Sequence, residues 1–134
     1  MNSKKSDKPQ RILLVDDDQH LLQSMGEWLN ANGFETGLAH NIDSATHLLS
    51  NAPYDLALID LRLGPEDGFD LLAHCNTHYP NTTSILMTGY ATVDTGIEAI
   101  RAGAFDLVTK PLIDEELLMS EFEKLACGRD ATQR

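Results

Sequence analysis

The chain has 134 residues, of which 42% are hydrophobic, and its formal net charge is −11 at pH 7. This length and composition suit one folded domain and exclude a largely disordered chain. The negative charge argues against direct binding of nucleic acid, and no apolar run reaches the ~20 residues that a membrane span needs.

The first half of the chain is predicted to form three strands separated by two helices. Residues 12–15 are wholly apolar and predict a buried strand, and the helical spacing of apolar residues over 18–32 ends at Gly33. Residues 34–39 have polar interruptions, which are typical of a strand at a sheet edge. A short helix is predicted over 43–50, and residues 56–59, apolar without alternation, predict a third strand.

The second half continues the alternation. A turn at Gly64-Pro65 precedes a helix predicted over residues 69–79, which Pro80 closes. Further strands are predicted over 85–87 and 105–108, and further helices over 93–102 and 114–126.

The two ends of the chain are polar. Residues 1–10 are predicted to form a disordered tail, and residues 127–134 a second tail or the start of a linker. Because residues 1–10 include no apolar segment of the kind found in secretory signals, we expect a cytoplasmic location and no membrane contact.

Five strand–helix units predict an α/β fold. Strands that are apolar on both faces belong to parallel sheets covered by helices on both sides, and right-handed crossovers favour a doubly wound five-stranded sheet. In such sheets the functional side chains lie beyond the carboxyl ends of the strands.

Reactive side chains stand at four of these strand ends: Asp16 and Asp17, Asp60, Thr88, and Lys110. Carboxylates brought together repel one another unless a cation neutralises them, and Mg²⁺ prefers oxygen ligands. A carboxylate can attack phosphorus, while a metal ion, a lysine and a threonine hydroxyl bind the phosphoryl oxygens. Helix capping is a simpler explanation of Asp18, and of Asp16 or Asp17 taken alone.

Residues 12–18, 55–63, 67–68, 87–90 and 103–111 together resemble the receiver domain of bacterial two-component response regulators, the chemotaxis-protein-like family. The resemblance extends over about residues 10–126 and implies a receiver domain over residues 11–126. It implies a flavodoxin-like fold with strand order 2-1-3-4-5 and a signalling switch rather than a turnover enzyme.

The resemblance also implies a role for each residue. Asp60 would accept the phosphoryl group, and Thr88 and Lys110 would contact it. Asp16, Asp17, Asp60 and the backbone carbonyl of Arg62 would bind Mg²⁺. The donor would be a sensor histidine kinase or a phosphotransfer protein, phosphorylation and dephosphorylation would be self-catalysed, and the phosphorylated chain would form a homodimer.

The chain departs from the family pattern at two places. Gly64-Pro65 replaces a proline that usually stands at position 64, and Leu107 replaces the usual switch aromatic. The run 88–110 most resembles receivers attached to transcription activators of the nitrogen-regulation type, which implies a role in transcription regulation.

A phosphatase of the haloacid-dehalogenase type is the main alternative. Residues 16–18 supply its D-x-D pair, with Asp16 as the nucleophile. His20 stands where that family prefers threonine or valine, the chain has no room for a cap domain, and Asp60 would have no role. A nucleotide- or flavin-binding module would need a glycine-rich loop where the acidic residues 16–18 stand.

Overall fold

The computed structural model describes residues 10–110 and 115–132, and its main sheet has five strands. All four neighbouring pairs are parallel, in the order β2-β1-β3-β6-β7. Numbered within this sheet alone, that order is 2-1-3-4-5, so the predicted topology is confirmed. The strands are β1 (Arg11–Val15), β2 (Glu35–Ala39), β3 (Leu56–Asp60), β6 (Thr83–Thr88) and β7 (Asp106–Thr109).

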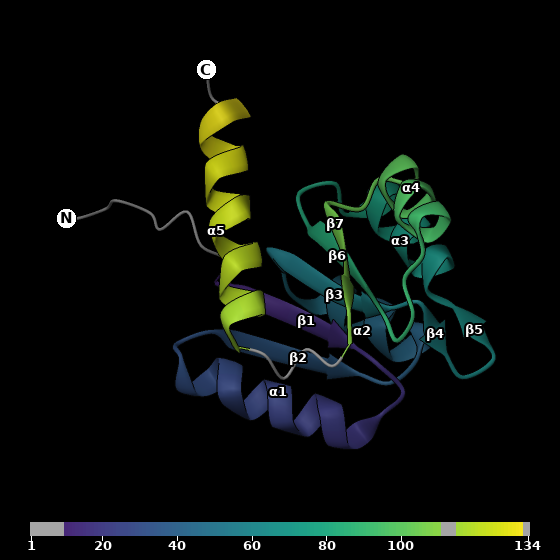
Figure 1. Ribbon diagram of the computed structural model, residues 1–134. Coiled ribbons are helices and arrows are strands. Elements are labelled where there is room, and N and C mark those ends of the chain that lie inside the picture. The colour runs from purple at the N-terminus through teal and green to yellow at the C-terminus, as the bar shows by residue number, and fades with distance from the viewer. Residues whose placement is uncertain (1–9, 111–114, 133–134) are drawn as a thin grey trace.

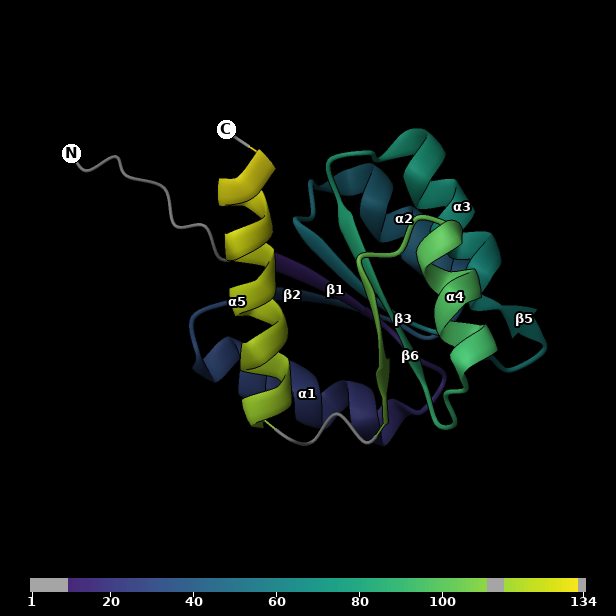
Figure 2. The same cartoon turned by 45° about the horizontal axis from the view of Figure 1, so that its top comes forward.

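Helices cover both faces of the sheet, as predicted (Figures 1 and 2). One face is covered by α1 (Gln19–Ala31) and α5 (Glu115–Thr132), and the other by α2 (Ile42–Asn51), α3 (Gly68–His78) and α4 (Val93–Arg101). Among the described residues, no helix is long and apolar enough to cross a membrane.

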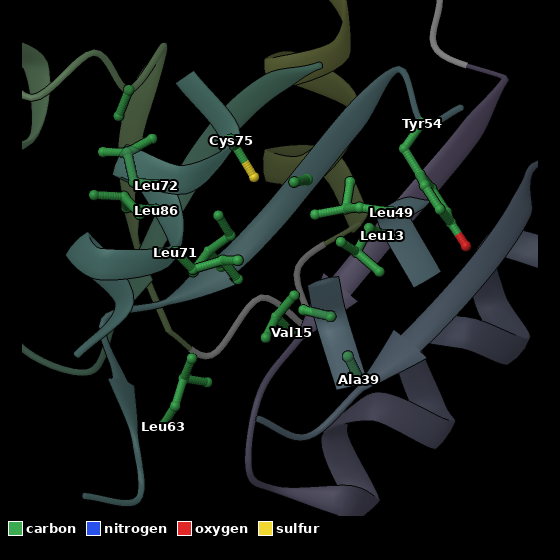
Figure 3. Packing of buried hydrophobic residues seen from close by; sticks show 14 of the residues in the cluster. Leu13, Val15, Ala39, Leu49, Tyr54, Leu63, Leu71, Leu72, Cys75 and Leu86 are labelled. Atoms are coloured by element: carbon green, nitrogen blue, oxygen red, sulfur yellow. The ribbon is translucent and has the colours of Figure 1, made fainter. Parts of the chain in front are cut away.

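The sheet separates two hydrophobic cores. Successive side chains of a strand point to opposite faces, so Leu58 of β3 packs in the core under α1 and α5, whereas Ile59 packs in the core under α2, α3 and α4. Figure 3 shows part of the second core, with Leu71 and Leu72 of α3 against residues of the central strands. Burial on both faces explains why β1 and β3 show no polar alternation.

Side-chain caps fix where the helices begin. The Asp18 carboxylate accepts hydrogen bonds from the backbone N–H groups of His20 and Leu21, which confirms its predicted role as an N-cap. Asn41 and Ser44 form a reciprocal capping box at the start of α2.

A two-stranded antiparallel hairpin was not predicted. It consists of β4 (Arg62–Leu63) and β5 (Glu66–Asp67), joined through Gly64 and Pro65. Gly64 has φ +64°, a left-handed conformation that favours glycine. The hairpin is too short to show the alternation by which strands are recognised.

The predicted end of the last helix at Ala126 is wrong, because α5 continues to Thr132. The prediction followed the apolar stripe, which ends at Leu125, but backbone hydrogen bonds extend a helix without one. Residues 127–132 therefore belong to helix α5, and whether they begin a linker stays a prediction. The predicted tail over 1–10 lies outside the described residues, except for Gln10.

Candidate functional site

Three carboxylates converge at the carboxyl end of the sheet. Asp16 and Asp17 follow β1 and Asp60 ends β3, and one oxygen of each lies within 4.8 Å of the others. Asp16 and Asp60 are only 1% and 5% exposed, whereas Asp17 is exposed. The structure thus brings together the three predicted carboxylates in a site open on the Asp17 side.

Lys110 neutralises part of this charge. Its Nζ lies 2.8 Å from Asp16 Oδ2 and 2.9 Å from Asp60 Oδ2. Burial lowers the pKa of Lys110, but its interactions with both carboxylates outweigh burial and raise the pKa above its ordinary value. Lys110 therefore stays protonated. One ammonium group facing three carboxylates leaves an excess of negative charge.

The pKa of Asp16 reflects its burial and the charges around it. Burial and the neighbouring charge of Asp60 raise the pKa of Asp16, against Lys110 and the N–H of Asp18, which donates to Asp16 Oδ1 at 2.9 Å. Asp16 Oδ2 has no aligned hydrogen-bond donor among the described residues, although Lys110 lies close to it. A buried oxygen of this kind, facing two other carboxylates, fits a hard divalent cation.

The backbone around Asp60 is fixed by close packing. The N–H of Leu61 donates to the carbonyl of Met87, and that of Gly68 donates to the carbonyl of Leu61 at 2.8 Å. A Cβ at position 68 would overlap the backbone oxygen of Asp60, so glycine is required there. Arg62 donates its backbone N–H to Asp60 Oδ1 at 3.1 Å.

Thr88 ends β6 at the same edge of the sheet. Its hydroxyl donates to the carbonyl of Tyr90 and accepts from the N–H of Tyr90, both at 3.2 Å, so it is bonded to the loop before α4. The carbonyl of Thr88 accepts from the N–H of Lys110 at 2.7 Å, which ties the ends of β6 and β7 together. A Cβ at Gly89 would meet open space, as expected for an open approach to the site.

The outer surface of α4 is apolar. Val93 is 80% exposed, and Ile97 and Ile100, one and two turns further along the helix, are also exposed, whereas the buried side presents Ala99. Leu107 of the neighbouring strand β7 is partly buried and contacts the core under α2, α3 and α4.

Two features of this region were not predicted from the sequence. The first is the exposed apolar surface of α4, although residues 93, 97 and 100 show helical spacing. The second is the backbone contact at Gly68, because no residue pattern distinguishes a glycine needed for close approach from one in a flexible turn.

Known proteins match this chain along most of its length. A family described as the response regulator receiver domain matches residues 12–122. Regulatory protein AtoC of Escherichia coli (strain K12) is 41% identical over 107 residues, covering 80% of this chain and 23% of AtoC. The alginate biosynthesis transcriptional regulatory protein AlgB of Pseudomonas aeruginosa is 34% identical over 120 residues, covering 90% of this chain and 27% of AlgB. The chain thus spans about a quarter of the length of these relatives.

Solved structures with the same fold include receiver proteins. A response regulator receiver domain protein (CheY-like) from Methanospirillum hungatei JF-1 matches with a TM-score of 0.81 and 31% identity, covering 91% of this chain and 98% of that one. A response regulator from Burkholderia pseudomallei, crystallised with a phosphorylated aspartic acid, a calcium ion and citrate, has a TM-score of 0.79 and 26% identity, covering 92% of this chain and 72% of that one.

Proposed function

The chain belongs to the response regulator receiver domain family, whose members are phosphorylated on an aspartate and act as signalling switches, and on that premise we propose that Asp60 is the acceptor. The observation that carries the proposal is the position of Asp60 at the end of the central strand β3: its carboxylate clusters with those of Asp16 and Asp17, and its Oδ2 lies 2.9 Å from Lys110 Nζ. Residues 11–126 form the receiver in this proposal.

The alternative phosphatase has no support. Its nucleophile would be Asp16, and Asp60, which Lys110 contacts as closely as it contacts Asp16, would have no role. The reported matches are receiver proteins and regulators, not phosphatases of that type.

The proposed chemistry takes place at the Asp60 carboxylate. An oxygen of the Asp60 carboxylate attacks the phosphorus of a phosphohistidine, the P–N bond breaks, and an acyl phosphate forms. Lys110 neutralises one phosphoryl oxygen while remaining protonated. Hydrolysis of the acyl phosphate by water releases inorganic phosphate and restores Asp60. In this proposal the chain itself catalyses both steps.

The carboxylates of Asp16, Asp17 and Asp60 and the carbonyl of Arg62 would hold Mg²⁺. When bound, the ion supplies positive charge to the phosphoryl oxygens. Three carboxylates and one ammonium group leave two negative charges, which a divalent cation balances.

Thr88 is expected to carry the signal away from the site. Its hydroxyl now bonds to the backbone of Tyr90. A phosphoryl group on Asp60 offers stronger, charged acceptors, so the hydroxyl would turn toward it and release Tyr90. The loop between β6 and α4 would then move, and α4 with it.

The exposed apolar surface of α4 suits a second copy of this chain. Asp94 and Arg101 lie about two helical turns apart, on the same side of the helix. When two copies pack with their α4 helices antiparallel about a two-fold axis, Arg101 of each copy faces Asp94 of the other. The apolar residues Val93, Ile97 and Ile100 then cover one another.

The phosphoryl donor in this proposal is a sensor histidine kinase or a phosphotransfer protein, and the output is control of transcription, as the names of its relatives suggest. The net charge of −11 opposes direct binding of nucleic acid by this chain. The cytoplasmic location stays a prediction.

The test is phosphorylation in vitro. Incubation with Mg²⁺ and a small phosphodonor should add one phosphoryl group, detected by mass spectrometry and mapped to Asp60. Asp60→Asn should abolish the addition, whereas the matched control Asp18→Asn, which keeps a good N-cap, should be modified like the unaltered chain. Equal modification of the Asp60→Asn chain would disprove the assignment.

A further inference from the structure

Two hydrogen bonds connect helix α2 to the carboxylate cluster through the β4–β5 hairpin. Glu66 Oε1 in β5 accepts from the backbone N–H of Ile42, the first residue of α2, at 2.9 Å. The N–H of Gly64, in the turn of the same hairpin, donates to Asp17 Oδ2 at 3.0 Å. The hairpin lies beside α2 at the carboxyl end of the sheet (Figure 1).

Asp17 depends on this hairpin more than its neighbours do. Asp16 and Asp60 are buried and held by Lys110, but Asp17 is exposed. Among residues 10–110 and 115–132, the Gly64 N–H is the donor that orients the Asp17 carboxylate. A free carboxylate would lose side-chain entropy on binding a metal ion, and an oriented one loses less.

Glu66 holds the hairpin in place at its other strand. The first backbone N–H groups of a helix have no partner within the helix, and the helix N-terminus favours negative charge. The Glu66 carboxylate accepts a hydrogen bond from the N–H of Ile42 and places a negative charge at this end of α2. Within the hairpin, Glu66 of β5 pairs with Leu63 of β4. Leu63 is buried in the core and holds β4, whereas the hydrogen bond from Ile42 to Glu66 holds β5.

We propose that Glu66 is a positioning residue for the metal site: by anchoring the hairpin to the N-terminus of α2, it holds the Gly64 N–H where it orients Asp17. This inference rests on the proposed binding of a divalent cation by Asp16, Asp17 and Asp60. Loss of such an outer partner typically weakens metal binding about 10-fold or more.

Calorimetric titration of the full chain with Mg²⁺ tests the inference. Glu66→Ala should weaken binding about 10-fold. Glu66→Gln removes the same charge but keeps an oxygen acceptor, so its Kd should stay within about twofold of the unaltered chain. Glu123→Ala, which removes an exposed carboxylate from α5, is the control and should also leave the Kd unchanged.

A second variant removes the donor instead of the acceptor. Ile42→Pro has no backbone N–H, and proline is well tolerated at the first position of a helix. It should weaken Mg²⁺ binding as much as Glu66→Ala, while circular dichroism shows a folded chain.

Three results would overturn the inference. Unchanged affinity in both Glu66→Ala and Ile42→Pro would limit Glu66 to a structural role. Equal weakening in Glu66→Gln and Glu66→Ala would mean that charge, not the hydrogen bond, matters. Absence of Mg²⁺ binding by the unaltered chain would instead remove the cation site on which the proposed function depends.

Discussion

Lys110 Nζ lies 2.9 Å from Asp60 Oδ2, so the ammonium group that follows β7 contacts the carboxylate at the end of β3. The lysine cannot balance Asp16, Asp17 and Asp60 together. The three carboxylates would therefore repel one another, and a divalent cation would relieve this repulsion.

The first prediction concerns stabilisation of the folded chain by Mg²⁺. A cation that binds the folded chain alone stabilises it by mass action. Millimolar Mg²⁺ should raise the melting temperature measured by calorimetry or circular dichroism, and Asp17→Asn should reduce the rise. Asp43→Asn, an exposed aspartate on α2, serves as the control. An equal rise in the Asp17→Asn chain would remove Asp17 from the metal site.

The second prediction concerns Leu107. This residue packs against the core but has no polar group to exchange between solvent and interior. Leu107→Ala should lower the free energy of unfolding by about 1–2 kcal/mol, less than a fully buried leucine. Beryllofluoride, a mimic of the phosphoryl group, should still shift the amide resonances of residues 88–101.

One outcome would show that Leu107 takes part in the conformational switch. If the Leu107→Ala chain is folded and binds beryllofluoride, but the shifts over residues 88–101 disappear, Leu107 is part of the switch. Thr88→Ala provides the comparison, because it removes the hydroxyl that bonds to Tyr90 and should diminish those shifts.

The third prediction concerns the surface of α4. With beryllofluoride and Mg²⁺, the chain should dimerise in analytical ultracentrifugation. Arg101→Asp alone and Asp94→Arg alone should each weaken the dimer, because like charges then meet across the two-fold axis. Mixing the two variants should restore it, since each cross-pair is again of opposite sign.

The mixture separates a second copy from any other partner. A surface that binds a different protein gives no reason for two defective variants to rescue each other. A chain that stays monomeric with beryllofluoride, or a mixture that stays monomeric, would refute the antiparallel arrangement of α4.

The fourth prediction concerns pH. Glu121 of α5 is 2% exposed, and burial, together with the neighbouring Asp106 carboxylate, raises its pKa above the ordinary 4.5, while Lys124 opposes the rise. The folded chain thus holds this proton more tightly than the unfolded chain. Its contribution to stability is present below the ordinary pKa and is lost as the pH rises through the raised pKa.

Glu121→Gln should flatten that part of the pH dependence, measured as the free energy of unfolding in urea between pH 4.5 and pH 8. Glu123→Gln, at an exposed position of the same helix, should leave the profile unchanged. Parallel profiles for Glu121→Gln and the unaltered chain would show that Glu121 titrates alike in both states.

The sheet could be predicted because its signals are local. The apolar runs around Leu13 and Leu58 mark strands buried on both faces, and Asp16, Asp60, Thr88 and Lys110 follow strands whose ends must share one edge. Convergence of the site therefore follows from the parallel topology, before any distance is known.

The features that were not predicted depend on contacts distant in sequence. Glu66 of β5 accepts a hydrogen bond from Ile42 of α2, and Gly64 of the hairpin turn donates one to Asp17, which follows β1. Neither pair shows a spacing or residue type that marks it. The outward apolar face of α4 was missed for another reason: helical periodicity indicates that a face is apolar but not whether the core or a partner covers it.

Position 68 has room only for glycine, and this limits how the domain can change by mutation. Gly68 performs no chemistry, yet any Cβ there would displace the carbonyl of Asp60 and with it the start of the loop that carries Arg62. A random screen for chains that fold but no longer accept a phosphoryl group should therefore recover substitutions of Gly68 alongside those of the acidic residues. Alanine, usually the mildest replacement, would already be among them.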